Sequence, residues 1–273
     1  MTRRDAHRGK PEIVVFGRHP IEEALRSEGV EVLRLALAKG RSPADRKAFR
    51  HLAHGYDIPF EEISRAEMDR LTGAPRHDQG MAAQIRLLRV MELDAFLATL
   101  TGRAARRSIR ILGLDGVTNS QNVGMVIRSV VGAGLDGFLW PLTGQPWVNG
   151  LVVRASSGAI FECPILRCDS VESGLAALQG AGFQTFGLET ESDVSLFASP
   201  TPHRAAYFLG GETSGLSLGV KEQLDGLVHI PMGGRLESLN VAVAAGLVAF
   251  HAVGLLEPTS SDDQSKGAGT SKR

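Results

Sequence analysis

The feature that most constrains the fold is a series of short apolar segments that alternates with helical segments from residue 109 onward. The apolar segments are continuous and show no polar alternation, so strands formed from them would be buried on both faces. Such strands belong to parallel sheets, because the crossover helices between them cover both sides. Residues 109–257 therefore predict an α/β domain with a mostly parallel sheet. The expected strands are Ile109–Leu114, Gly137–Pro141, Pro164–Leu166, Gln184–Leu188, Ala206–Leu209 and Leu227–Ile230, and the expected helices are Gln121–Ala133, Val171–Ala181, Leu218–Leu224 and Leu239–Leu255.

A second, smaller α/β domain is predicted over residues 12–90, followed by a helix and linker over residues 91–108. The linker, Thr101–Arg107, is basic and contains a glycine. Residues 1–11 and 258–273 are charged or polar and cannot bury apolar area, so both ends are expected to be disordered. The expected strands are Ile13–Phe16, Val32–Ala38, Pro59–Ile63 and Met81–Leu87, and the expected helices are Pro20–Ser27, Pro43–His54, Ala66–Leu71 and Met91–Leu100.

Charge is distributed unevenly along the chain of 273 residues, although the formal net charge is zero. Residues 1–108 hold 20 Lys and Arg against 15 Asp and Glu, a net charge of +5, and the remaining residues balance this with −5. A basic half indicates a module for an anionic partner such as a nucleic acid. A solvated surface gives the same excess, so the charge alone does not decide between the two.

The cysteines and the apolar segments bear on the cellular compartment. Cys163 and Cys168 are the two cysteines of the chain, and they suit neither a disulfide framework nor a metal site, which favours free thiols in a reducing compartment. The polar, basic N-terminus has no apolar core of a signal peptide. The longest apolar run, Val241–Leu256, contains His251 and is shorter than the ~20 residues of a membrane span. We expect a cytoplasmic protein in which this run is a core or interface helix.

Polar residues gather at the start of the helix predicted over Gln121–Ala133. Asn119 and Ser120 are candidates for its N-cap, and Asn122 lies in its first turn. Arg128 follows Gly124 by one helical turn, so the two share a face, and the glycine would leave open space beside the guanidinium. A backbone-donating helix start next to an arginine suits a phosphate group, although a capped helix with a surface arginine has the same sequence.

A glycine-rich loop follows the strand predicted over Ala206–Leu209. Gly210, Gly211 and Gly215 surround Glu212, and glycines after a parallel strand let a ligand approach the backbone. Ligands of open α/β sheets bind at this end of the strands. The glycine spacing does not fit the dinucleotide fingerprint G-x-G-x-x-G.

The stretch Val228–Phe250 places polar residues at the mouth of an apolar helix. A strand ends, Pro231 and a glycine pair interrupt regular structure, and then Ser238 and Asn240 precede the helix. A buried polar group without a partner costs about 1–3 kcal/mol. Ser238 and Asn240 are therefore expected either to cap the helix or to face a polar ligand.

Together these three blocks resemble the signature motifs of the SpoU (TrmH-type) RNA 2′-O-ribose methyltransferases, within the SPOUT class. The resemblance covers about residues 109–256, in the family's order, and the segment Arg154–Ala159 resembles a fourth family segment, K-x-S-x-G-A. One departure is Asn119-Ser120, where many members have Asp-Pro. The small domain, through Gly17–Leu25 and Gln79–Met81, resembles the family's substrate-binding domain, which is related to the L30e/L7Ae ribosomal proteins. The matching motif residues are Asn122, Gly124 and Arg128; Gly210, Glu212 and Gly215; and Ile230, Pro231, Met232, Gly234, Ser238, Leu239, Asn240, Val241 and Ala244.

The resemblance implies a trefoil-knotted parallel-sheet domain, a homodimer with its active site at the interface, and RNA as substrate. It implies S-adenosylmethionine as cofactor and no metal. Arg128 would anchor phosphate and orient the ribose hydroxyl; arginine is effectively always protonated, which argues against a role as general base. The implied catalytic residues are Arg128, Asn122, Glu212, Ser238 and Asn240, and the implied cofactor-binding residues are Leu209, Gly210, Gly211, Gly215, Ile230, Pro231, Met232, Ser238 and Leu239.

Three alternatives share parts of this pattern. A tRNA methyltransferase of the same family differs in its substrate, and the L30e-like domain favours 23S ribosomal RNA over tRNA. A non-catalytic RNA-binding protein of ribosome assembly would also have a basic N-terminal half, but it would not need Arg128, Glu212 and Asn240. A nucleotide-binding oxidoreductase would share the sheet but lacks its fingerprint here. The sequence does not name the methylated nucleotide, because RNA selection depends on shape and unstacked bases.

Overall fold

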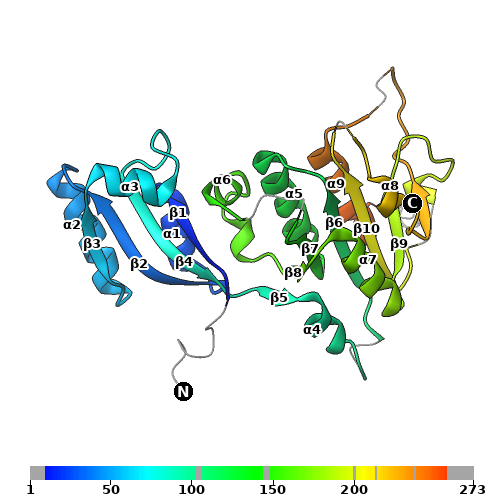
Figure 1. Ribbon diagram of the computed structural model, residues 1–273, viewed down its shortest axis with the longest axis horizontal. Helices are drawn as coiled ribbons and strands as arrows, with labels where there is room; N and C mark the ends of the chain where they lie inside the picture. Colours follow the sequence, from blue (N-terminus) through cyan, green and yellow to red (C-terminus); the bar gives the residue numbers. More distant parts are fainter. Residues whose placement is uncertain are drawn as a thin grey trace, which may run out of the picture.

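The computed structural model describes residues 10–102, 106–143, 148–198, 201–212, 214–235 and 238–256. They form a small and a large domain, each built on its own sheet, which lie side by side along the long axis of the molecule (Figure 1). Residues 1–9, residues 103–105 of the predicted linker and the tail over 258–273 lie outside the described residues.

The small domain is a four-stranded sheet in the order β1-β4-β2-β3, with β4 antiparallel to both of its neighbours. Two of its helices begin at residues with strong capping side chains: the Ser42 side chain accepts from the Asp45 amide, and Ser64 and Glu67 form a capping box. The first helix follows Gly17, which has no side chain to cap it. Its elements are β1 (Glu12–Phe16), α1 (Arg18–Arg26), β2 (Val30–Ala38), α2 (Pro43–Gly55), β3 (Phe60–Ile63), α3 (Arg65–Thr72) and β4 (Met81–Leu87).

The large domain is a parallel sheet of seven strands in the order β11-β9-β10-β6-β7-β8-β5, as the apolar strand pattern predicts. Its strands are β5 (Val90–Glu92), β6 (Ile109–Asp115), β7 (Gly137–Pro141), β8 (Ile165–Cys168), β9 (Gln184–Leu188), β10 (Arg204–Gly210) and β11 (Gly226–Val228). Its helices are α4 (Leu93–Ala98), α5 (Ser120–Ala133), α6 (Gly150–Ala155), α7 (Val171–Gly180), α8 (Leu218–Lys221) and α9 (Val241–Ala252). Short 3-10 turns lie at Ala159–Phe161 and Leu196–Ala198.

Several predicted elements differ from the structure by a few residues at their ends, α8 and β11 among them, and three differences have a clear local cause. The helix expected over Met91–Leu100 begins as β5, because Val90, Met91 and Glu92 pair with β8 at the edge of the large sheet before α4 starts. Helix α6 follows the Asn149 cap and is too short for its apolar period to be recognised in the sequence. Helix α9 starts at Val241 rather than Leu239, because Asn240 is its N-cap.

Helices cover both faces of the large sheet. Apolar side chains of α5, α6 and α9 pack on one face, against residues such as Trp140, whereas α4, α7 and α8 pack on the other, against residues such as Phe208. Both free cysteines belong to this domain; burial raises the pKa of Cys163 and raises that of Cys168 to about 12. Among the described residues, no helix is long and apolar enough to cross a membrane.

Candidate active site

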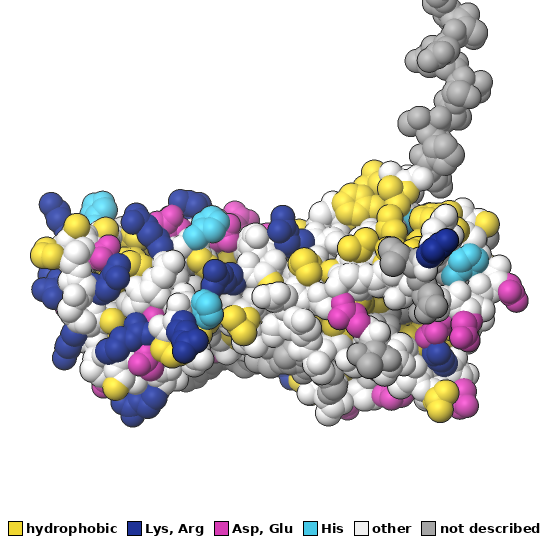
Figure 2. Space-filling model, turned by 90° about the horizontal axis from the view of Figure 1, so that it is seen from above, with side chains coloured by type: hydrophobic (Ala, Val, Ile, Leu, Met, Phe, Trp, Pro, Cys, Tyr) yellow, Lys and Arg dark blue, Asp and Glu magenta, His cyan; other side chains and the backbone are white. Residues whose placement is uncertain are grey.

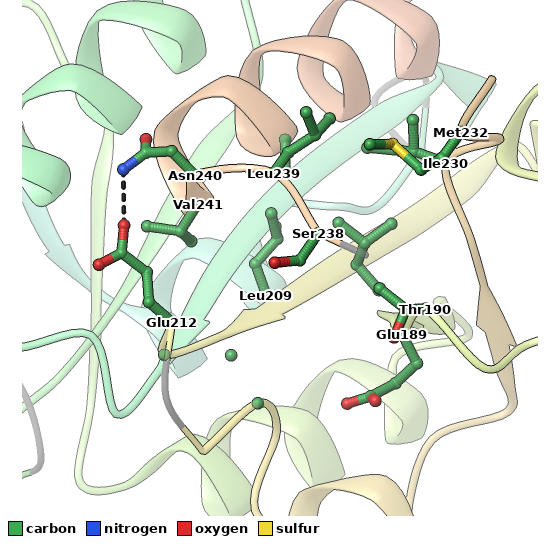
Figure 3. A pocket seen from close by; sticks show the side chains of 15 residues that line it. Glu189, Thr190, Leu209, Glu212, Ile230, Met232, Ser238, Leu239, Asn240 and Val241 are labelled. Carbon is green, nitrogen blue, oxygen red and sulfur yellow. Dashed lines mark hydrogen bonds between the residues drawn. The ribbon is translucent and has the colours of Figure 1, made fainter. Parts of the chain in front are cut away.

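A cavity of about 440 Å³ opens at the carboxyl ends of β9 and β10, the place where open parallel sheets bind ligands. Residues after β9, the loop after β10 and the segment that leads into α9 line it (Figure 3). The structure thus brings together two segments that the sequence singled out. The predicted cofactor-binding residues that line the cavity are Leu209, Gly210, Gly211, Gly215, Ile230, Met232, Ser238 and Leu239; Pro231 is not among the lining residues.

Three predicted catalytic side chains form a hydrogen-bonded triangle. Glu212 Oε1 accepts from Asn122 Nδ2 at 3.0 Å and from Asn240 Nδ2 at 2.5 Å, and the latter bond is visible in Figure 3. Asn122 Oδ1 lies 3.3 Å from the same Asn240 nitrogen. The three residues come from α5, the loop after β10 and the cap of α9. Because each side chain restrains the other two, the triangle ties the three segments together at the cavity.

The glycines after β10 are required by a tight turn. A Cβ atom at Gly210 would lie 1.9 Å from the carbonyl carbon of Gly215, and Gly215 itself has a φ of +63°. The Gly215 amide donates to the Gly211 carbonyl at 2.9 Å, so the loop folds back on itself. Larger residues at Gly210 or a β-branched residue at Gly215 would force this loop open.

Asn240 and Ser238 have different roles at the start of α9. Asn240 Oδ1 accepts from the Ala242 amide at 3.0 Å, so Asn240 caps α9 while its amide nitrogen holds Glu212. Ser238 is exposed, makes no cap, and lies beside Leu209 on the cavity wall (Figure 3). The sequence left open which of the two residues caps the helix; Asn240 does so, because α9 begins at Val241.

Arg128 is not brought to this cavity in its own chain. It is exposed on α5 and has no hydrogen bond or ion pair with any of the described residues. The expected space beside Gly124 is also absent, because a Cβ atom there would lie 2.4 Å from Ala155 Cβ. Gly124 instead permits close packing of α5 on α6.

The segment after β9 also lines the cavity, although the sequence did not single it out. Leu188, Glu189 and Thr190 line the cavity, and Glu189 is held by Lys221 at 2.9 Å and by the Leu216 amide at 3.3 Å. The predicted strand Gln184–Leu188 could have indicated that the residues after it line the cavity, because loops after neighbouring parallel strands meet at one edge of a sheet. No cluster of metal-ligating side chains occurs among the residues that the structure describes.

Two family models match the chain. The model of the SpoU rRNA methylase family matches residues 109–250, and a model described as RNA 2′-O ribose methyltransferase substrate binding matches residues 14–91.

Individual proteins are similar over most of their length. An uncharacterized tRNA/rRNA methyltransferase of Mycobacterium sp. strain KMS is 32% identical, covering 90% of this chain and 77% of its own. The 23S rRNA (guanosine-2′-O-)-methyltransferase RlmB of Xylella fastidiosa is 30% identical, covering 88% of this chain and 95% of its own. The crystal structure of the SpoU methyltransferase AviRb from Streptomyces viridochromogenes, in complex with AdoMet, superimposes with a TM-score of 0.64 at 25% identity, covering 92% of this chain and 91% of that one.

Proposed function

The chain belongs to the SpoU rRNA methylase family, and we propose that its substrate is a ribose 2′-hydroxyl of 23S ribosomal RNA. It is an S-adenosylmethionine-dependent RNA 2′-O-methyltransferase. The observation that supports a methyl-transfer site in this cavity is the Asn122–Glu212–Asn240 triangle at its mouth. The triangle places hydrogen-bonding side chains of three motifs around one opening. The choice of ribosomal RNA follows the names of relatives such as RlmB of Xylella fastidiosa.

The cavity fits the cofactor in size and chemistry. Its volume lies in the range of pockets for ligands of this size. Leu209, Ile230 and Leu239 offer apolar walls, and the glycine turn exposes backbone groups where a side chain would otherwise fill the space. When bound, S-adenosylmethionine supplies an electrophilic methyl group on a positively charged sulfonium. The carboxylate of Glu212 would favour that positive charge, whereas the charge of Glu189 is already paired with Lys221.

The triangle would orient the ribose. Glu212 Oε1 is occupied by the two asparagines, which leaves Oε2 to accept a hydrogen bond from a ribose hydroxyl. Alignment of the hydroxyl oxygen with the methyl group is the main task of such a site, because orientation alone is worth several kcal/mol. Arg128 would hold the neighbouring phosphate and orient the hydroxyl as a permanent cation.

We propose that the enzyme works as a homodimer in which Arg128 of one subunit reaches the cavity of the other. Met125 on α5 is 41% exposed and Val243 on α9 is 54% exposed, and apolar side chains gather at one edge of the large domain in Figure 2. Exposed apolar groups of this kind mark interaction surfaces. The same two helices carry Arg128 and the Asn240 cap, so pairing through them would supply the arginine that each cavity lacks.

Two further features of the family are part of the proposal. Strand β11 lies at the edge of the sheet, whereas the next element along the chain, α9, packs against α5. We infer that the connection between the two completes the trefoil knot. A ribosomal RNA substrate also places the proposed reaction in the cytoplasm.

Ribose-methylation mapping of ribosomal and transfer RNA, with and without the gene, tests the substrate. We expect one 2′-O-methyl group in 23S ribosomal RNA to disappear with the gene and to return when purified enzyme and S-adenosylmethionine are added to the undermethylated RNA. A missing methyl group in tRNA alone would assign the enzyme to the tRNA branch, and unchanged maps in both RNA pools would contradict the proposal.

A further inference from the structure

A second cavity, of about 170 Å³, lies at the seam between the two domains. Its walls come from the start of α1, from the loop that contains His77 and Gln79, from Val153 and Arg154 of α6, and from Ser157, which follows α6. We propose that this seam cavity binds one unpaired nucleotide of the RNA substrate, with its phosphate held by Arg154. The inference rests on the proposed function for the identity of the RNA. The site it adds is only partly within the substrate-binding region, residues 14–91, because Val153, Arg154 and Ser157 lie outside that range.

The seam is closely packed, so the walls of the cavity are held in place. A Cβ atom at Gly29 would lie 1.7 Å from the Phe161 carbonyl oxygen, and one at Gly150 would lie 2.0 Å from the Phe16 ring. Next to these contacts, the Ser27 hydroxyl donates to Glu162 Oε1 at 2.6 Å, which also crosses from one domain to the other. Only glycine allows such close approaches, because any side chain would push the domains apart.

The edge of the cavity presents hydrogen-bond donors. An Arg154 guanidinium nitrogen lies 3.2 Å from His77 Nδ1 across the seam. Since arginine can only donate, His77 accepts at Nδ1 and carries its own hydrogen on Nε2. Gln79 Oε1 accepts from the Arg18 amide at 3.2 Å, which leaves the Gln79 amide group to donate. A guanidinium, an imidazole N–H and an amide together suit a ligand rich in acceptors, and the phosphate of a nucleic acid is such a ligand.

The floor of the cavity is apolar. Phe16 and Val153 are 5% and 1% exposed, and Pro20 lies beside them. The volume corresponds to roughly six water molecules, which is room for part of one nucleotide and not for a duplex. Glu23 also lines the cavity and lies 3.3 Å from His19, so this carboxylate can accept from the amino group of a base. An apolar floor beneath polar edges is the arrangement by which proteins hold unstacked bases.

Backbone strain is concentrated at the same place. Among the described residues, three non-glycine residues have a positive φ, and two of them, Gln79 at 54° and Ser157 at 49°, line the seam cavity. Such conformations are unfavourable for residues with a Cβ and persist where the surrounding structure holds them, often at binding sites.

The seam cavity is connected to the active site through two packed helices. Arg154 and Ala155 are neighbours on α6, and Ala155 is the residue against which Gly124 of α5 packs. Helix α5 also carries Asn122 of the catalytic triangle. In Figure 2, basic and histidine side chains gather over the small domain and continue toward the seam. An RNA strand held at the seam would therefore be placed beside the element that helps to orient the reacting ribose.

RNA binding by the full chain tests this inference, with fluorescence anisotropy of a labelled single-stranded RNA of about a dozen nucleotides. Arg154→Gln should raise Kd about tenfold and lower the salt slope of binding by about one, because one phosphate contact is lost. His77→Ala should weaken binding less, and the two changes should not add, because the side chains contact each other. Arg70→Gln is the matched control, since the hydrogen bond that Arg70 makes among the described residues stays within its own helix, to the Ala66 carbonyl.

An unchanged Kd and salt slope for Arg154→Gln would overturn the inference. An equal loss of RNA affinity with Arg70→Gln would also overturn it, because the effect would then come from the overall positive charge and not from the seam cavity. Calorimetric binding of S-adenosylmethionine to each variant confirms that it is folded. The anisotropy readout does not depend on methyl transfer. A protein that binds RNA through Arg154 but methylates none would contradict the proposed function and leave the seam site supported.

Discussion

At the scale of single residues, Asn240 has the most roles at the site. Its side-chain oxygen caps α9 through the Ala242 amide, and its nitrogen holds Glu212. The sequence placed Asn240 at the site through the family motif, but it did not distinguish which of Ser238 and Asn240 would cap the helix. Both residue types are good caps, and the choice depends on where the chain turns into the helix, which is set by packing of α9 on α5.

Substitutions at Asn240 should separate its capping role from its role in the triangle. Asn240→Ser keeps a capping oxygen but is too short to reach Glu212, so stability should stay within about 0.5 kcal/mol of the wild type. Methyl transfer should fall by about tenfold or more, because Glu212 is no longer oriented. Asn240→Ala should show a similar fall in methyl transfer, and its free energy of unfolding should also fall by about 1 kcal/mol because the cap is lost. Chemical denaturation and single-turnover methylation measure the two effects, and a Ser variant of wild-type activity would remove the triangle from the mechanism.

At the scale of elements, the sequence predicts what local chemistry determines. Helix α5 begins after the Asn119 cap and ends at Gly134, which has the left-handed conformation of a helix terminus. In contrast, β5 is a strand of three residues that depends on pairing with β8, and α6 depends on packing against α5. Nothing within these short segments distinguishes them from other conformations, since tertiary contacts decide their structure.

Gly124 tests the packing of α5 on α6. Gly124→Ala would place a methyl group 2.4 Å from Ala155 Cβ, so the helices must move apart, at a cost of about 1–3 kcal/mol. Gly132→Ala is the control in the same helix, because the nearest atom to its new methyl group would be 3.8 Å away, in the Phe250 ring. That variant should gain up to about 1 kcal/mol from helix propensity. Equal stabilisation of both variants in urea denaturation would show that α5 and α6 are not in close contact.

At the scale of the whole molecule, the fold brings distant segments to one opening. Asn122 and Asn240 are far apart in the sequence, and the sheet order places their helices side by side. The sequence motifs predicted this convergence through family resemblance, whereas the seam cavity has no sequence signature, because its walls belong to two domains. Arg128 is the exception, since the single chain leaves it exposed and away from the cavity. Its position is explained if the complete site belongs to a dimer.

Hybrid dimers decide whether Arg128 acts on the cavity of its partner. Arg128→Ala and Asn240→Ala should each lose about tenfold or more of the wild-type activity as homodimers. In a doubly tagged hybrid of the two, one cavity would keep its own Asn240 and receive an intact arginine from the other subunit, so about half of the wild-type activity should return. A hybrid of Asn122→Ala with Asn240→Ala should stay inactive, because these two residues contact each other within one chain, at 3.3 Å. If Arg128 served its own chain, every cavity of the first hybrid would be defective. Both hybrids would then be equally inactive, and an active site shared between subunits would be excluded.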